Sequence, residues 1–238
     1  MWKARGEPPK RLGAHQAKPK HLHFLLDASA SMARGDAMDG RLRRMAATAA
    51  LLMEALHGFE HKFVYSLTAH SGSTAELPLL EAGSPPATSD ERARVVGSLF
   101  SHASSAASGQ RSRSLERGGV SKPSAACHHL PNMAGDHSME AARRAIEAAA
   151  AVDADDRYVF LLSDANLGRY DVSPDALGAV LRSDPHVRAY AIFVAEPQAA
   201  KWLAEQLPFG RGFAVHEVAR LPAVMREIFT HAAISDET

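Results

Sequence analysis

The chain has 238 residues, of which 46% are apolar, so it is long enough to bury the core of one sizeable domain. Its 27 basic and 27 acidic side chains balance, so the overall charge favours neither a nucleic acid nor an acidic partner. The single cysteine, Cys127, excludes an internal disulfide and is compatible with a reducing compartment, and no apolar stretch approaches the roughly 20 residues of a membrane span.

The first 20 residues differ in charge from the rest of the chain. They contain six basic residues and one acidic residue, a net charge of +5, which leaves about −5 for the remainder. They lack the apolar region of a secretory signal peptide and contain too little serine for a typical transit peptide. We interpret residues 1–20 as a solvated basic arm, with a docking or targeting segment as the alternative.

Strand-like and helix-like segments alternate over residues 21–234, which we expect to form one domain. Apolar runs and apolar residues at helical spacing predict, in chain order, a strand at 21–27, a helix at 39–57, strands at 62–68 and 76–80, helices at 90–102 and 138–151, a strand at 157–162, a helix at 174–183, a strand at 187–194 and helices at 197–206 and 220–233. Pro78 has no backbone N–H to donate, so the strand at 76–80 must lie at an edge. This alternation predicts an α/β fold with a doubly wound, mostly parallel sheet flanked by helices.

One segment interrupts the pattern. Residues 103–126 contain seven serines, three glycines and Pro123 but few apolar residues. A structureless loop of that length is unusual inside a compact domain, so we predict a disordered insertion there.

The first predicted strand ends in the pattern D-x-S-x-S, formed by Asp27, Ser29 and Ser31. Side chains two residues apart at the end of a strand can converge on one small cation. Asp and Ser offer only oxygen, which suits Mg²⁺, Mn²⁺ or Ca²⁺ better than Zn²⁺ or copper. The pattern therefore predicts a site for a hard divalent cation.

Further oxygen ligands are expected from other loops at the same edge, because ligands of open α/β sheets collect beyond the carboxyl ends of the strands. Asp164 follows the strand at 157–162, and Asp136 and Ser138 stand at the start of the helix at 138–151. Together with the first loop, Asp164 and one residue of 136–138 would supply about five ligands. Mg²⁺ prefers six, so one position remains for the Asp or Glu carboxylate of a protein partner.

These loops resemble the metal-ion-dependent adhesion site of von Willebrand factor A domains, in which D-x-S-x-S is followed by a Thr and an Asp from two later loops. Asp27, Ser29 and Ser31 match the first loop and Asp164 matches the last. The Thr position falls on Asp136, with Ser138 two residues later, and either could take its role. The resemblance implies a metal site for Mg²⁺, or for Mn²⁺ or Ca²⁺, built from Asp27, Ser29, Ser31, Asp136, Ser138 and Asp164.

A narrower resemblance covers nearly the whole chain, from about Trp2 to about Thr230. It is carried by four spaced motifs: Met38-Asp39-Gly40-Arg41-Leu42, Ala69-His70-Ser71-Gly72, Gly135-Asp136-His137-Ser138 and Ser163-Asp164-Ala165-Asn166-Leu167. These are similar to the adhesion-type domain at the end of large mitochondrial AAA+ ATPases. The resemblance implies a substrate-recruiting or regulatory module of an AAA+ motor, joined in cis or acting in trans, an intracellular and mitochondrial location, and a chain that is the tail of a longer protein.

The ATPase activity is not implied for this chain. It contains no G-x-x-x-x-G-K-[S/T] phosphate loop and no Gly-Lys pair at all. We therefore predict a non-enzymatic, divalent-metal-dependent protein-binding domain. The alternative is a metal-dependent phosphoryl-transfer enzyme that uses Asp27, but enzymes of the haloacid dehalogenase kind need a second acid two residues later, where this chain has Ser29.

Three other features receive simpler interpretations. The tripeptide 34–36, Arg-Gly-Asp, is interpreted as a coincidence in the loop after the metal motif. Cys127-His128-His129 and His137 do not have the spacing of a standard zinc site and are interpreted as surface residues. His70 and Ser71 end a strand at the expected edge, where they either orient other groups of the site or serve a purely structural role.

Overall fold

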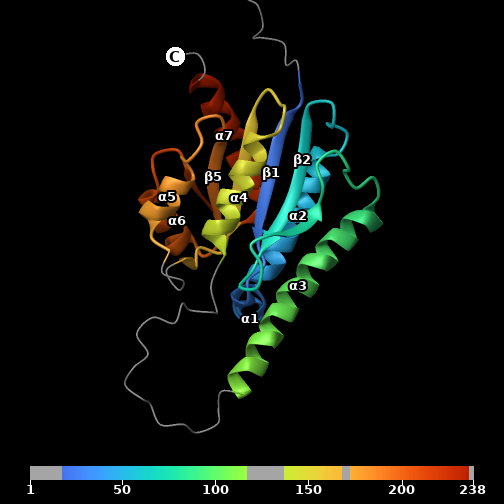
Figure 1. Cartoon of the computed structure of the whole chain (residues 1–238), viewed down its shortest axis with the longest axis vertical. Helices are drawn as coiled ribbons and strands as arrows, with labels where there is room; N and C mark the ends of the chain where they lie inside the picture. The colour runs from blue at the N-terminus through green and yellow to red at the C-terminus, as the bar shows by residue number, and fades with distance from the viewer. Residues whose placement is uncertain (1–17, 117–136, 168–171, 236–238) are drawn as a thin grey trace, which may run out of the picture.

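The computed structural model describes residues 18–116, 137–167 and 172–235. These residues form one six-stranded sheet in the order β3-β2-β1-β4-β5-β6 (Figure 1). The strands are β1 (Lys20–Asp27), β2 (Phe63–His70), β3 (Leu77–Leu80), β4 (Arg157–Ser163), β5 (Arg188–Val194) and β6 (Gly212–Val215). All neighbouring strands are parallel except β2 and β3, which are antiparallel. Pro78 lies in β3, at the edge of the sheet, as predicted.

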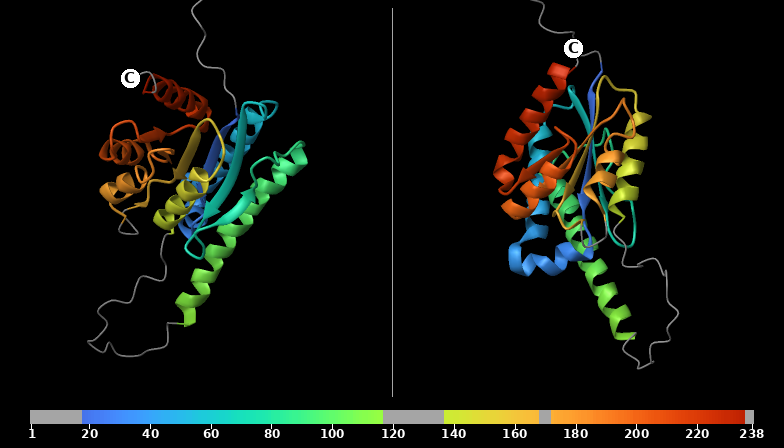
Figure 2. Two further views of the ribbon diagram at one scale, coloured as in Figure 1. Left: turned by 45° about the horizontal axis from the view of Figure 1, so that its top comes forward. Right: turned by 90° about the vertical axis from the view of Figure 1, so that its left-hand side faces the viewer.

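Helices cover both faces of the sheet (Figure 2). They are α1 (Ala30–Asp39), α2 (Arg41–Leu56), α3 (Ser89–Glu116), α4 (Ser138–Ala150), α5 (Pro174–Val180), α6 (Pro197–Gln206) and α7 (Leu221–Ser235), with a 3-10 turn at Val218–Arg220. Apolar side chains of α2, α3 and α7 pack on one face, and those of α4, α5 and α6 pack on the other. The predicted α/β, doubly wound architecture is therefore confirmed.

The apolar runs form the central strands because these strands are covered on both faces. In β1, Leu22, Phe24 and Leu26 pack toward α2 and α7, whereas Leu25 packs toward α4. This alternation follows from the two-residue period of a strand. The same alternation places Asp27, at the end of β1, on the same face of the sheet as Leu25.

The structure corrects two expectations and adds two elements that the sequence did not predict. The disordered insertion expected at 103–126 is wrong for its first part, because α3 continues to Glu116; the stretch 103–116 holds no proline and only one glycine, so nothing local ends the helix. Residues 117–126 lie outside the described residues. Helix α1 and strand β6 were not predicted, and α1 places residues 34–36 in a helix rather than a loop.

A buried polar cluster of three residues connects β1 with β2. His23 is 7% exposed, and its Nδ1 and Nε2 atoms lie 3.0 Å from Ser66 Oγ and 2.9 Å from Thr68 Oγ1. A neutral imidazole satisfies both contacts, because hydroxyls donate or accept as required. Burial, and secondarily repulsion from His21, lowers the pKa of His23 to about 4.

We expect acid to destabilise the fold through His23. Its pKa in the folded protein is below the ordinary value of 6.5, so the unfolded chain takes up the proton first as the pH falls. Stability from neutral His23 is therefore complete above about pH 6.5 and is lost down to about pH 4, by at most about 3 kcal/mol. Urea unfolding at several pH values should show a flatter dependence in His23→Gln than in wild type. The exposed control His61→Gln should keep the wild-type slope, and an unchanged slope in His23→Gln would contradict the assignment.

Candidate metal centre

The candidate site lies where the winding of the sheet reverses. From β1 the strand order proceeds to β2 and β3 on one side and to β4, β5 and β6 on the other. The adjacent ends of β1 and β4 are thus a topological switch point, the position at which open α/β sheets bind ligands. Asp27 ends β1, and Asp164 directly follows β4. Helix α1 lies at this end of the molecule, opposite the start of β1 and the end of α7 (Figure 1).

The first loop is folded by its own polar groups. Ser29 donates its backbone N–H to Asp27 Oδ1 over 2.8 Å, and the hydroxyls of Ser29 and Ser31 are 2.8 Å apart. Asp27, Ser29 and Ser31 are all buried, with 4%, 2% and 5% exposure. Helix α1 starts directly after Ser29, so the helix fixes the direction of the second hydroxyl. The loop therefore presents one carboxylate and two hydroxyls in a restricted space.

Asp164 makes the same kind of turn at the end of β4. Its Oδ1 atom accepts the backbone N–H of Asn166 over 3.0 Å, which repeats the contact between Asp27 and the residue two positions later. Between them Ala165 has φ of +63°, and it is the one non-glycine residue with positive φ in the described part of the chain. An alanine in this conformation costs on the order of 1 kcal/mol. Local backbone strain of this kind is common at functional sites, and here it accompanies the turn in which Asn166 binds the Asp164 carboxylate.

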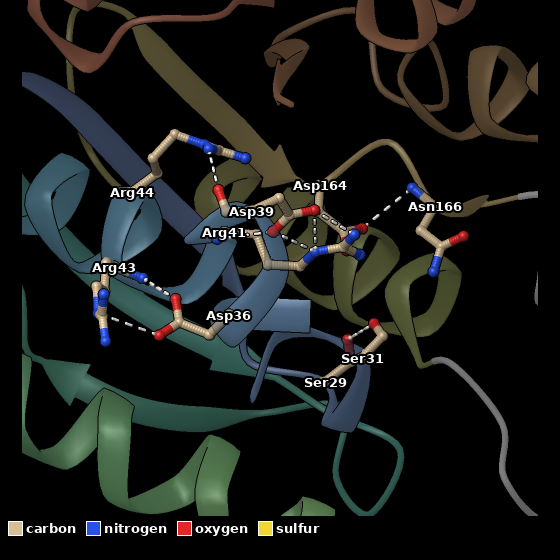
Figure 3. Close-up of polar contacts among 9 residues, drawn as sticks. All are labelled: Ser29, Ser31, Asp36, Asp39, Arg41, Arg43, Arg44, Asp164 and Asn166. Atoms are coloured by element: carbon tan, nitrogen blue, oxygen red, sulfur yellow. Dashed lines mark hydrogen bonds and ion pairs between the residues drawn. The ribbon is translucent and has the colours of Figure 1, made fainter. Parts of the chain in front are cut away.

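Arg41, the first residue of α2, reaches the same carboxylate. Its Nη1 atom donates to Asp164 Oδ2 over 2.6 Å, while its Nε and Nη2 atoms donate to the carboxylate of Asp39 (Figure 3). The fork with Asp39, followed by the charge of Asp164, raises the pKa of Arg41 further above its ordinary value. The hydrogen bond from Arg41 likewise lowers the pKa of Asp39. Arg41 is thus a permanent cation at the candidate site.

The middle loop is described only in part. Ser138, the first residue of α4, is fully buried, and its hydroxyl lies 3.4 Å from Nε2 of His70. His70 is the register partner of Asp27 on β2, so the contact ties Ser138 to the first loop. Asp136 lies outside the described residues.

Ser71 also lies at this edge and is fully buried. Its hydroxyl contacts Nε2 of His102 on α3 over 3.0 Å and Ser73 Oγ over 2.9 Å. Of the two residues that end the predicted strand, His70 therefore contacts a candidate ligand, whereas Ser71 connects the loop to α3.

The donor set fits a hard cation. Among the described residues, no three His, Cys, Asp or Glu side chains are grouped closely enough to hold a metal ion by themselves. A metal here would depend on two carboxylates and on hydroxyls, and such oxygen-only sets suit Mg²⁺ or Mn²⁺ and not Zn²⁺. The Ser163 hydroxyl, next to Asp164, is buried without a hydrogen-bond partner in the described structure, so a polar group such as water is expected beside it.

Sequence reasoning named the carboxylates and hydroxyls of this edge but missed the cation. Arg41 and Asp39 belong to a motif that was used only for the family resemblance, and no spacing rule connects Arg41 with Asp164. The positive φ of Ala165 could not be recognised from the sequence either.

Of the other residues considered from sequence, Cys127, His128 and His129 lie outside the described residues. Among the helices described, none is long and apolar enough to cross a membrane.

Comparison with known proteins finds a relative that matches nearly the whole chain. It is 32% identical over 237 residues to von Willebrand factor A domain-containing protein 8 of Mus musculus, a match that covers 99% of this chain and 11% of the mouse protein. The chain thus spans about a tenth of that relative. No protein-family model matches the chain.

Two solved structures share the architecture at low sequence identity. The conserved hypothetical protein BatB of Bacteroides thetaiotaomicron is 14% identical, with a TM-score of 0.51, over 90% of this chain and 98% of its own. The PilB minor pilin of Streptococcus sanguinis is 10% identical, with a TM-score of 0.51, over 92% of this chain and 62% of its own. At these identities the similarity concerns the fold.

Proposed function

Since the chain is a von Willebrand factor A domain, we propose that it captures protein partners through a divalent metal ion held at the ends of β1 and β4. The observation that carries this proposal is the pair of buried carboxylates, Asp27 and Asp164, at adjacent strand ends beside the hydroxyls of Ser29 and Ser31. Two acids at one switch point suit a divalent cation better than any neutral ligand.

Each residue has a distinct part in this proposal. The carboxylates of Asp27 and Asp164 supply negative charge, and the hydroxyls of Ser29, Ser31 and Ser138 supply neutral oxygen donors. The backbone N–H groups of the two turns hold the carboxylates in fixed orientations, so little ordering is needed on binding. A bound Mg²⁺ or Mn²⁺ would supply a Lewis-acidic position for an Asp or Glu carboxylate of a partner. Asp136 remains a candidate ligand alongside Ser138.

We further propose that the domain recruits substrates to, or regulates, an AAA+ motor in cis or in trans, in mitochondria. Support comes from the similarity to a segment of the mouse protein and from the four spaced motifs. The fold is compatible with attachment to a larger assembly. Strand β1 begins and α7 ends at the opposite end of the sheet from Asp27, so connections there would leave the candidate site facing outward (Figure 1).

We expect the domain to bind one Mn²⁺ per chain and to capture its partner only when metal is present. Mn²⁺ titration followed by electron paramagnetic resonance measures the first property. Affinity capture from a mitochondrial lysate in Mg²⁺, compared with the same lysate in EDTA, measures the second. Absence of Mn²⁺ binding would contradict the metal site, and capture that persists in EDTA would contradict metal-dependent recognition while leaving the site intact.

No observation favours the phosphoryl-transfer alternative. Such a reaction at Asp27 needs an acid two residues later, and the hydroxyl of Ser29 stands there, paired with Ser31. Protein binding is therefore the function that the arrangement supports best.

A further inference from the structure

Arg41 is held at the candidate metal centre from three sides. Asp39 binds its Nε and Nη2 atoms, Asp164 binds its Nη1 atom, and Gly35 of α1 lies against the guanidinium. A Cβ atom added at Gly35 would lie 2.7 Å from Cζ of Arg41 and closer still to its Nε, and real Cβ atoms do not adopt such short distances. The guanidinium therefore fits in its position only because glycine, at position 35, has no side chain.

The turn between α1 and α2 directs Arg41 toward this position. Gly40 has φ of +67°, so the chain reverses between Asp39 and Arg41 and both side chains meet on one side. The ion pair with Asp164 is well shielded, because the Asp164 side chain is only 3% exposed and that of Arg41 is 23% exposed. A charge pair so little exposed is weakly screened by salt.

The contact with Asp164 has a consequence for any metal ion. Arg41 already binds Oδ2 of Asp164, and Asn166 binds Oδ1, so a metal that uses this carboxylate must approach an oxygen next to a fixed positive charge. A divalent cation and the guanidinium of Arg41 repel each other when both bind one carboxylate, and the guanidinium cannot lose its charge by deprotonation. Arg41 and a divalent cation thus compete for the same carboxylate.

We propose that Arg41 is a resident cation of this site, which lowers its affinity for divalent metal by occupying Asp164. The inference rests on the proposed metal site and adds the residue that sets its affinity. Arg41 offsets one negative charge and leaves the site better suited to an anionic partner.

A purely positioning role for Arg41 predicts the opposite change in metal affinity. If Arg41 only positioned Asp164 for the metal, its removal would weaken metal binding. If Arg41 competes with the metal, its removal strengthens binding. The direction of the change in affinity therefore separates the two roles.

The test compares Mn²⁺ affinity, measured by electron paramagnetic resonance, in wild type and in Arg41→Gln, which keeps much of the side chain but removes the charge. We expect the Mn²⁺ dissociation constant of Arg41→Gln to be about tenfold lower than that of wild type, the effect expected when a unit charge near a dication is removed. Arg43→Gln is the matched control, since Arg43 makes its ion pair with Asp36 and its side chain is 75% exposed. It should stay within about twofold of wild type.

Two further variants test the mechanism. Gly35→Ala keeps the arginine but displaces it, and should lower the dissociation constant by about threefold, a smaller effect because the charge remains nearby. Arg41→Gln combined with Asp39→Asn should keep the tighter binding, which excludes the released Asp39 as its source. In EDTA, thermal unfolding should show a larger loss of stability in Arg41→Gln than in Arg43→Gln, because Asp164 loses a buried partner.

An unchanged or weaker affinity in Arg41→Gln, with normal Mn²⁺ binding by wild type, overturns this inference and leaves the proposed metal site standing. Absence of Mn²⁺ binding in every variant overturns both the inference and the metal site.

Discussion

Replacing Asp27 by asparagine is expected to weaken Mn²⁺ binding by at least about 100-fold, because loss of a charged ligand should exceed the 10- to 100-fold effect of losing a ligand's supporting contact. Asparagine keeps a side-chain oxygen that can accept the N–H of Ser29, so the turn of the first loop should survive. Only the charge and one oxygen donor are removed. Isothermal titration calorimetry with Mn²⁺ measures the loss.

The chain contains a matched control for this substitution. Asp184 accepts the backbone N–H of His186, two residues later, in the same type of turn, but it lies before β5 and therefore at the opposite edge of the sheet. Asp184→Asn should bind Mn²⁺ as wild type does. If Asp27→Asn and Asp184→Asn retained equal, wild-type affinity, the assignment of Asp27 as a ligand would be wrong.

A Phe160→Ala variant is expected to lose about 4 kcal/mol of unfolding free energy, near the middle of the range for deletion of a buried phenylalanine. Phe160 is fully buried in β4, and its ring stacks on Phe24, Tyr158 and Tyr190 at centroid distances of 5.2, 6.0 and 5.8 Å. Phe229 of α7 meets it edge-on at 6.2 Å. Removing the ring therefore leaves a cavity between the sheet and α7. Urea denaturation measures the change.

The control for this variant is Phe209→Ala, because Phe209 is fully exposed and its loss should change the unfolding free energy by less than about 0.5 kcal/mol. Should Phe160→Ala fail to fold, Phe160→Leu fills part of the space and should show a smaller loss. A loss of under 1 kcal/mol in Phe160→Ala would mean that the aromatic cluster contributes little to stability.

Several elements were accessible from local pattern. The strands at 21–27, 62–68, 157–162 and 187–194 are covered on both faces, and such strands appear in sequence as unbroken apolar runs. Helix α4 was equally clear from its apolar spacing. Helix α1 was missed because it carries no apolar periodicity, having only three buried residues at its start. Strand β6 was missed because its four residues are too few for a pattern.

The candidate site also contains residues that could be predicted from the sequence and one that could not. Asp27, Ser29 and Ser31 are neighbours in sequence, so their convergence follows from local geometry alone. Asp164 could be expected beside them because parallel strands end at one edge. The contact from Arg41 to Asp164 could not be expected, since it spans 123 positions and depends on the reversal at Gly40 and on the space beside Gly35.

The sequence by itself therefore determined the fold class and the chemistry of the oxygen donors, because both arise from periodicity and from residue types close together in the chain. Only the tertiary structure decided the charge of the site. It placed an arginine from the start of α2 on the last carboxylate, because packing of α1 and α2 at the switch point brings together groups that no local pattern connects. In this domain the D-x-S-x-S loop predicts a metal site, and Arg41 is the residue that we propose sets its affinity.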